Sequence, residues 1–244
     1  MSRACTETLP GCVPGGDGVS RGMPAPTVVR RCLPWLAALM MLAVAGMASG
    51  APRFVAGQDY RTVDSPEIIG NGSKVEVAEV FWYGCPHCYH FEPELEHWLA
   101  GHRAGIHFVR IPATLNPGWR MDARGYYVGR VLGVMDRKMT DAIFKAIHQQ
   151  HRQLASESAW RHFYTTHGVS ASDFNNAWQS FAVDAKLRRA DHLVRLYGVM
   201  GVPTLVVNGK YVTSPEMAGG EDRALQVVDF LVHKARAEMH DGGS

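Results

Sequence analysis

The sequence predicts an α/β fold in which a βαβ unit and a ββα unit flank a long helical block. An apolar stretch, Lys74 to Tyr83, leads into a Cys-Pro-His-Cys segment and then into apolar residues at helical spacing. A long run with helical character follows, from about Trp119 to Tyr197. Two β-prone runs joined by Asn208-Gly209 then precede a final amphipathic stretch.

The first unit is contained in residues 74–111. Lys74 to Tyr83 alternates at first and then becomes wholly apolar, as expected of a strand that enters a buried sheet. Gly84 breaks the strand, and Pro86 suits the first turn of a helix. The helix then presents apolar residues at regular spacing: Phe91, Leu95, Trp98 and Leu99. Ile106 to Ile111 is a second strand, so the Cys-x-x-Cys lies where strand becomes helix.

The helical block contains one clear start signal. Ser170 and Asp173 form a capping box ahead of three aromatic residues that we expect in the core, namely Phe174, Trp178 and Phe181. We interpret the aromatic residues of this block as core rather than as contacts to a cofactor.

The second unit begins after the block. Thr204 to Val207 and Lys210 to Thr213 flank Asn208-Gly209, a strong signal for a two-residue hairpin. A helix from Glu221 to about Ala237 carries an apolar face with Leu225, Val228, Phe230, Leu231 and Val232. A βαβ unit with Cys-x-x-Cys, completed by a hairpin and a helix, is the thioredoxin arrangement, here with an inserted all-helical domain.

We therefore expect four segments along the chain. Residues 1–50 are a leader, residues 51–116 the first thioredoxin-like part, residues 117–197 the helical insertion, and residues 198–244 the second thioredoxin-like part.

The leader resembles a secretory signal peptide. Arg30-Arg31 precedes a short apolar run that ends in small residues near Ala48 and Gly50, where we expect cleavage. Met23 is an alternative start, because it gives a normal basic region before the apolar run. An uncleaved anchor is the other reading, but the run is short and is broken by proline and glycine. The twin arginines leave open whether export is by the Sec or the Tat route.

Cleavage changes the cysteine count and the charge. Three of the five cysteines leave with residues 1–50, so the exported chain keeps only Cys85 and Cys88. The leader also removes four arginines and two acidic residues, which leaves 21 basic and 21 acidic side chains. A neutral chain without a basic run argues against a nucleic-acid partner.

A structural zinc site is one reading of the Cys-x-x-Cys. Zinc needs four ligands, and His87 and His90 lie too close to the cysteines in the chain to complete a tetrahedron with them. A distant pair, His148 and His151, is a conceivable supplement. We expect no metal here.

An inert disulfide is another reading, but a two-residue ring restricts the unfolded chain little. A redox pair makes better use of the position. Cys85 would face unpaired N–H groups at the positive end of the helix dipole, which stabilises a thiolate. Cys88, one turn later, would resolve a mixed disulfide formed by Cys85, and Pro86 and His87 would complete the activating turn.

Two motifs together resemble the DsbA family of periplasmic thiol:disulfide oxidoreductases. They are C-P-H-C followed by Tyr89-His90-Phe91, and G-V-P-T-L-V-V-N-G-K-Y at 201–211. The resemblance covers roughly Gln58 to the C-terminus, and F-W-Y-G-C-P-H-C-Y is most similar to the pseudomonad and xanthomonad branch. It implies that Cys85 is the attacking cysteine and Cys88 the buried resolving one.

The resemblance also implies a cis peptide bond between Val202 and Pro203, facing the disulfide. Without the resemblance, this X-Pro bond at a strand start would be expected to be trans. A cis bond would turn the Val202 backbone outward to pair with an extended substrate segment by β-augmentation.

Glu79 lies six residues before Cys85, where the family keeps a buried acid beneath the active site. Arg110 falls where better-known members have a lysine partner to that acid. A strand-edge ion pair with no catalytic role is the alternative reading. Pro112 stands where some members have a histidine, so any role of that histidine is absent here.

The resemblance implies a periplasmic dithiol oxidase that passes the Cys85–Cys88 disulfide to reduced exported proteins. It implies no cofactor besides this disulfide, a monomer, and re-oxidation by a quinone-linked membrane protein of the DsbB kind. A disulfide isomerase or reductase of the same fold is an alternative. The isomerases carry an added dimerisation domain, and the roughly 25 residues between the leader and Lys74 leave no room for one. A chaperone-like peptide-binding module is the alternative from another class.

Overall fold

The structure is a computed structural model that describes residues 54–241, so the predicted leader, with Met23 and Cys32, lies outside it. Within the described residues the strands are β1 (Arg61–Thr62), β2 (Val75–Phe81), β3 (Ile106–Pro112), β4 (Thr204–Val207) and β5 (Tyr211–Thr213). The helices are α2 (Pro86–His102), α3 (Pro117–Val131), α4 (Arg137–His148), α5 (Glu157–Thr166), α6 (Ala171–Trp178), α7 (Phe181–Leu196), α8 (Pro215–Ala218) and α9 (Glu221–Asp241).

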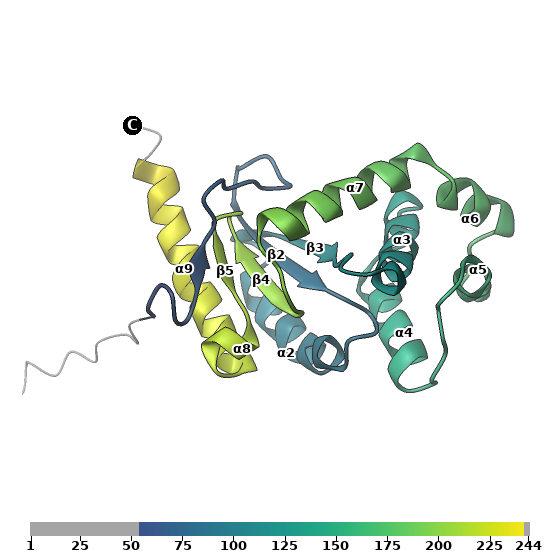
Figure 1. Cartoon of the computed structure of the whole chain (residues 1–244), viewed down its shortest axis with the longest axis horizontal. Helices are drawn as coiled ribbons and strands as arrows, with labels where there is room; N and C mark the ends of the chain where they lie inside the picture. Colours follow the sequence, from purple (N-terminus) through teal and green to yellow (C-terminus); the bar gives the residue numbers. More distant parts are fainter. Residues whose placement is uncertain (1–53, 242–244) are drawn as a thin grey trace, which may run out of the picture. The chain divides into compact units, whose positions relative to one another are not determined.

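The five strands form one mixed sheet in the order β1-β5-β4-β2-β3 (Figure 1). β2 and β3 are parallel, as a βαβ crossover requires, and the other pairs are antiparallel. Asn208 and Gly209 both have positive φ, at 51° and 64°, so the predicted two-residue hairpin joins β4 to β5. β3 is therefore one edge of the sheet, and β1 is the other.

Helices cover both faces of the sheet. Val75 and Val77 of β2 pack with α2 and α9 on one face, while Ala78 and Val80 pack with α7 on the other. This division follows the two-residue period of a strand, whose side chains point alternately to opposite faces. β2 is buried along its whole length, as its apolar run predicts.

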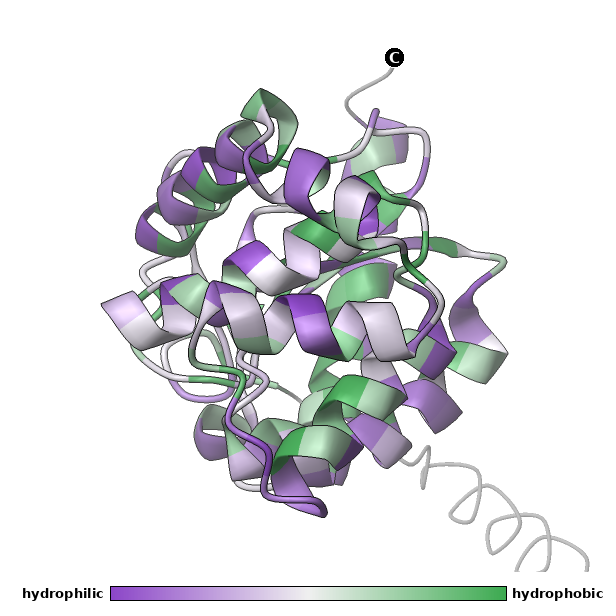
Figure 2. Ribbon diagram, turned by 90° about the vertical axis from the view of Figure 1, so that its right-hand side faces the viewer, coloured by the Kyte–Doolittle hydropathy of each residue, from purple (hydrophilic) through white to green (hydrophobic). Residues whose placement is uncertain are grey.

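The helices α3 to α6 form a separate hydrophobic core beyond β3 (Figure 1). Figure 2 views this side and shows hydrophilic and hydrophobic residues alternating along the helices. Ser170 caps α6 as predicted, since its Oγ accepts from the Asp173 N–H at 3.0 Å. Gly125 permits the close packing of α3 on α5, because a Cβ there would lie 2.4 Å from the Trp160 ring.

The prediction for Phe181 is wrong. Phe174 and Trp178 are buried, but Phe181 is 78% exposed. The helix that contains Trp178 ends there, and Ser180 caps a new helix whose first residue is Phe181. The helical spacing therefore does not continue across this break, and Phe181 contacts the guanidinium of Arg188 instead.

Three other features differ from the prediction or were absent from it. α9 continues to Asp241 rather than ending near Ala237, and the short elements β1 and α8 carry too few residues to show a period.

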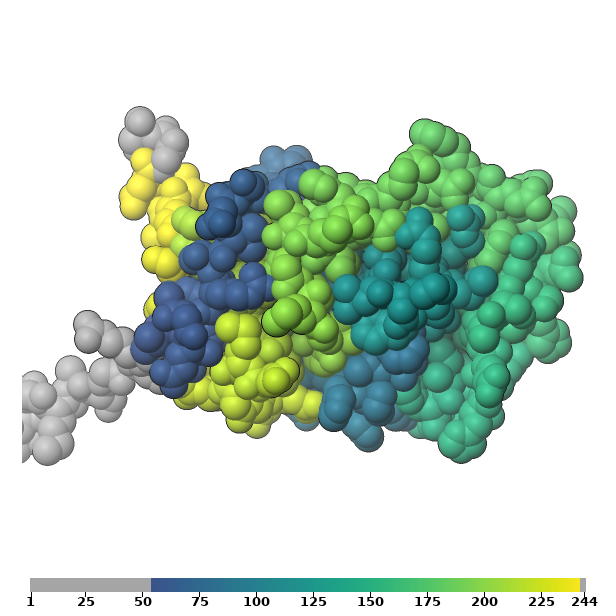
Figure 3. Space-filling view, viewed as in Figure 1, coloured from purple at the N-terminus to yellow at the C-terminus, as the bar shows by residue number. Residues whose placement is uncertain are grey.

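Figure 3 shows that the first described segment and the segment after residue 200 form one continuous surface. Asp59 explains this contact, because its backbone oxygen accepts from Thr213 and its carboxylate pairs with Arg223.

Candidate active site

The Cys-x-x-Cys lies at the junction of β2 and α2. Cys85 is the N-cap residue of α2, with extended backbone angles, and Pro86 occupies the first helical turn. The Cys85 N–H donates to the Trp82 carbonyl at 3.0 Å, which fixes the turn between strand and helix. The structure contains the reduced pair, with both thiols free.

Cys85 retains a small exposed fraction of 7%, and its surroundings favour the thiolate. A hydrogen bond from the Cys88 thiol, the backbone N–H groups of Cys88 and His87, and the charge of His87 lower the pKa of Cys85 to about 6. Burial opposes this shift and is outweighed. The thiol makes no side-chain capping bond, so these N–H groups remain available to an ionised sulfur.

Cys88 has the opposite environment. It is fully buried, in a hydrophobic cluster that contains Tyr83 and Phe144. Burial, the hydrogen bond with Cys85 and the negative charge of Glu79 raise the pKa of Cys88. The two thiols therefore differ strongly in acidity, and only Cys85 ionises readily at neutral pH.

The second motif of the sequence meets the first at this site. The Val202–Pro203 peptide bond is cis, and the Cys85 thiol donates to the Val202 carbonyl at an Sγ–O distance of 3.6 Å. A groove of about 460 Å³ runs beside this peptide bond and is lined by Val202, Pro203 and His87. Met200 also lines the groove and is 94% exposed, which gives it an apolar rim.

Glu79 and Arg110 form a buried ion pair beneath the site, with Arg110 Nε 2.8 Å from Glu79 Oε2. The Glu79 side chain is 0% exposed and that of Arg110 is 9% exposed, so this is not a surface pair. Burial raises the pKa of Glu79, although Arg110 opposes the shift. The second oxygen of Glu79, Oε1, has no hydrogen-bond partner among the described residues.

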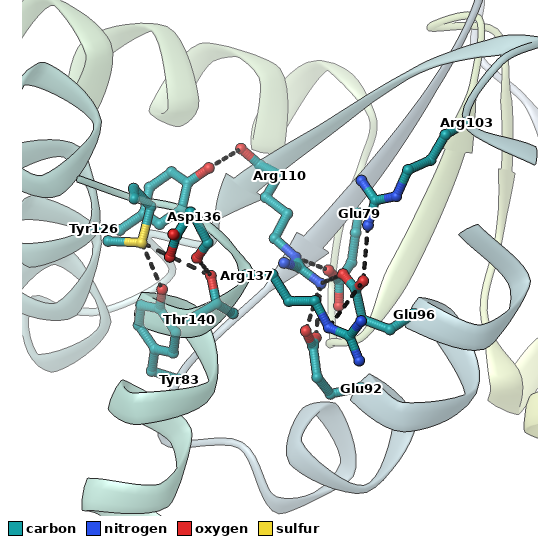
Figure 4. Close-up of polar contacts among 11 residues, drawn as sticks. Glu79, Tyr83, Glu92, Glu96, Arg103, Arg110, Tyr126, Asp136, Arg137 and Thr140 are labelled. Carbon is teal, nitrogen blue, oxygen red and sulfur yellow. Dashed lines mark hydrogen bonds and ion pairs between the residues drawn. The ribbon is translucent and has the colours of Figure 1, made fainter. Parts of the chain in front are cut away.

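Two further acids belong to this cluster and were not predicted from the sequence. Arg110 Nη2 lies 2.8 Å from both oxygens of Glu92 and 3.4 Å from Glu96 (Figure 4). Both acids come from α2, next in the chain to the buried residues Phe91 and Leu95. Burial raises the pKa of Glu92 to about 8. The weak signal in the sequence is that both acids fall on the apolar side of the helix.

One of the histidines considered for zinc, His148, is engaged in another way. His148 Nε2 donates to the Tyr83 carbonyl at 2.8 Å, and its ring stacks on Tyr89. Within residues 54–241, no three His, Cys, Asp or Glu side chains gather as a metal site. None of the helices in this range is long and apolar enough to cross a membrane.

A thioredoxin fold with an acidic N-cap cysteine, a buried partner cysteine and a facing cis-proline defines a thiol:disulfide oxidoreductase. Residues 76–232 match the family model of the DSBA-like thioredoxin domain. The chain belongs to the DsbA family.

Named relatives cover most of the chain. The thiol:disulfide interchange protein DsbA of Pseudomonas aeruginosa is 38% identical over 201 residues, which span 82% of this chain and 95% of the relative. DsbA of Burkholderia cepacia is 38% identical over 194 residues, spanning 79% and 91%. The crystal structure of P. aeruginosa DsbA has a TM-score of 0.71 at 37% identity, covering 76% of this chain and 96% of that one. The oxidoreductase DsbA of Xylella fastidiosa has a TM-score of 0.70 at 31% identity, covering 75% and 98%.

The lowered pKa of Cys85 predicts selective alkylation. Iodoacetamide should modify Cys85 in the reduced protein with a rate that rises through a midpoint near pH 6, because the thiolate is the nucleophile. Cys88 should stay unmodified across the same range. Mass spectrometry of peptides after timed quenching measures both rates. Equal rates at the two cysteines, or a midpoint near the free-thiol value of about 8.5, would contradict the assignment.

The buried pair predicts that Glu79→Gln affects both stability and the chemistry of Cys88. Arg110 keeps Glu92 and Glu96, so we expect a loss below the roughly 3–5 kcal/mol typical of breaking a buried pair. Because the charge of Glu79 acts on Cys88, the variant should also change the lifetime of a mixed disulfide on Cys85. Denaturant unfolding and quenched-flow gels measure the two effects.

Glu94→Gln is the control, since Glu94 is an exposed acid on α2, the helix that begins at the Cys-x-x-Cys. It should leave both quantities unchanged. If Glu79→Gln lowers stability but leaves the lifetime of the mixed disulfide unchanged, the pair is structural only.

Proposed function

We propose that this protein oxidises reduced, newly exported proteins in the periplasm by donating its Cys85–Cys88 disulfide. The observation that carries the proposal is the opposite shift of the two thiol pKa values at one helix N-terminus. A sulfur that is stable as a thiolate is a good leaving group, so a mixed disulfide on Cys85 breaks easily in favour of the client. Stabilising the reduced form in this way makes the disulfide oxidising.

The transfer has two steps. A client thiolate attacks Cys85 Sγ, a client–Cys85 disulfide forms, and Cys88 leaves as a thiolate that takes up a proton. A second client thiolate then attacks the client sulfur of this bond, and Cys85 leaves as a thiolate. The client gains a disulfide, and the two cysteines are reduced by its two electrons. Glu79 is our candidate for giving a proton to Cys88 and taking it back. It is buried, and its Oε1 has no hydrogen-bond partner among the described residues.

The groove beside Pro203 is our candidate for the client segment. The Val202 carbonyl lies within hydrogen-bonding distance of Cys85, and a client strand that replaced the thiol as donor would bring its own cysteine to Cys85. The exposed Met200 offers an apolar contact. Backbone pairing of this kind is independent of client sequence, as a general oxidase requires.

The proposal extends to the catalytic cycle, in which the disulfide must be restored after each transfer. We propose that the protein works as a monomer without a cofactor other than its own disulfide. A membrane protein of the DsbB kind, coupled to quinone, would restore the disulfide. The apolar residues that line the groove, among them Val199, Met200 and Met217, suit contact with such a partner as well as with clients.

Disulfide transfer is tested with a reduced, unfolded protein that contains two cysteines. Mixed in equal amounts, the oxidised wild type should convert this client to its disulfide form and become reduced itself. Cys85→Ser should transfer nothing. Reduced Cys88→Ser, mixed with the disulfide form of the client, should accumulate an adduct, because the Cys85 thiolate attacks the client disulfide and the resolving thiol of Cys88 is missing. Thiol alkylation followed by mass spectrometry follows all three. Protection of the client from aggregation by the double serine variant, without transfer by the wild type, would favour the chaperone reading.

The pH dependence of stability separates an oxidase from a reductase. The folded pKa of Cys85, about 6, lies below its unfolded value, so ionisation stabilises the reduced fold. The benefit is complete above the unfolded-state pKa and is lost as pH falls through about 6. Relative to the oxidised form, the reduced form should therefore gain about 1.4 kcal/mol per pH unit between pH 6 and 8.5.

Denaturant unfolding of both forms from pH 5 to 8.5 measures this difference, in which the titrations of groups other than the two cysteines cancel. The Cys88 thiol stays protonated in the fold, so it affects the difference only as its unfolded-state pKa is approached at the upper end of the range. The two-residue ring adds little by loop closure, so the reduced form should be the more stable at the upper end of the range. A difference that is independent of pH, or an oxidised form that is more stable throughout, would contradict the oxidase assignment.

A further inference from the structure

A second pocket lies at the free edge of β3, away from the cysteines. Its volume is about 510 Å³, within the range of ligand-binding clefts. Residues of α2, β3, α3, α4 and α7 line it, and it shares no lining residue with the groove beside Pro203. Occupants of the two sites would therefore not exclude each other.

Backbone groups of β3 face this pocket. The Ala113 N–H donates to the Phe81 carbonyl of β2, whereas the Arg110 carbonyl accepts from the Tyr126 hydroxyl of α3. N–H and C=O groups alternate in direction along a strand, so Phe108, two residues before Arg110, directs both of its groups toward the free edge. Pro112 has no N–H and limits pairing to this part of the edge.

Cationic side chains surround this edge. The pocket lining contains two carboxylates, Glu96 and Asp136, and six cations, namely Arg103, Arg110, Arg130, Arg137, Lys186 and Arg189. Glu96 contacts three of the arginines (Figure 4). Asp136 accepts from the Met139 N–H at the start of α4. The lining therefore holds more positive than negative charge.

Two of the cations have no counter-charge. Within the part of the chain that the structure describes, no carboxylate lies within 4.0 Å of Arg130 or Lys186, and both are exposed. Arg189 is paired with Glu67 outside the pocket. A concave site with an excess of one charge concentrates ligands of the opposite charge.

We propose that this pocket binds an extended acidic peptide segment. Its backbone pairs with β3 at Phe108, and its carboxylates meet Arg130 and Lys186. The half-buried Phe108, with Tyr126 and Tyr127, gives the apolar contacts that a strand with alternating acidic and apolar residues would use.

The physiological occupant follows from the proposed function, on which this step rests. A reduced client that carries an acidic extended segment would fill the pocket while its cysteine reaches Cys85. Binding at two sites on one chain raises the effective concentration of the second contact. Clients with such a segment would then be oxidised faster than others.

The binding itself is tested in the Cys85→Ser, Cys88→Ser protein, so that no redox exchange contributes. The probe is a blocked eight-residue peptide of alternating valine and glutamate, with valine and glutamine as the neutral comparison. The acidic peptide should bind at least tenfold more tightly, and its affinity should fall as salt is added. The Phe108 amide resonance should shift on binding and become protected from exchange.

Charge reversals locate the site. Arg130→Glu and Lys186→Glu should each weaken the acidic peptide about tenfold. Arg161→Glu and Arg188→Glu are matched controls, because both residues are exposed, on α5 and α7, outside the pocket. They should leave the affinity unchanged. Weakening by the controls to the same extent would overturn the proposal.

Other outcomes also overturn it. If neither peptide binds, the cations serve only to keep this strand edge from pairing with other chains. If succinate binds as tightly as the acidic peptide, the site takes small organic anions. If the resonance shifts are confined to His87 and Val202, the peptide occupies the other groove.

Transfer kinetics then separate this proposal from the proposed function. In otherwise wild-type protein, Arg130→Glu should slow oxidation of a reduced client with an acidic segment several-fold. A client without the segment should be oxidised at the unchanged rate. If Arg130→Glu leaves the rate for the acidic client unchanged, or slows both clients by the same factor, the role in client binding is overturned, whereas failure of the wild type to oxidise either client contradicts the proposed function instead.

Discussion

The arrangement of the site depends on one buried guanidinium. Arg110 of β3 contacts Glu79 of β2 and both Glu92 and Glu96 of α2, so a single cation holds the active-site helix to two parallel strands. Glu96 also pairs with Arg103 and Arg137, so Arg110 is left with two carboxylates, Glu79 and Glu92. One positive charge does not compensate both in a medium of low dielectric constant. Burial raises the pKa of Glu92 to about 8, which favours the neutral carboxyl and so reduces the excess of negative charge.

The position of α2 in turn sets the chemistry of both thiols. Cys85 at its N-cap meets backbone N–H groups, whereas Cys88, one turn further, is buried among aromatic side chains. The same short helical segment therefore stabilises one thiolate and destabilises the other. Glu79, buried beneath the helix, adds to this asymmetry, because it is close enough for its negative charge to raise the pKa of Cys88.

Much of this site can be predicted from the sequence, because the signals that specify it are local. A strand, a break and Pro86 place Cys85 at a helix start, and the hairpin is marked by two adjacent residues. The cis bond at Pro203 was expected only from the family resemblance, since X-Pro bonds are mostly trans. Glu92 and Glu96 were missed because acidic side chains on a helix are usually exposed, and only the tertiary position of Arg110 makes their burial possible.

The helical insertion explains why Cys88 is so poor an acid. Cys88 and Tyr83 belong to the same hydrophobic cluster as Phe144 of α4 and Trp160 of α5, so the insertion extends its core up to the cysteines. His148 at the end of α4 adds a hydrogen bond to the Tyr83 carbonyl and ties α4 to the strand-to-helix turn. These contacts keep water from Cys88 and raise its pKa, while the N–H groups of α2 act on Cys85 alone. The redox asymmetry is therefore a joint property of the thioredoxin fold, which supplies the helix N-terminus, and of the insertion, which supplies the burial.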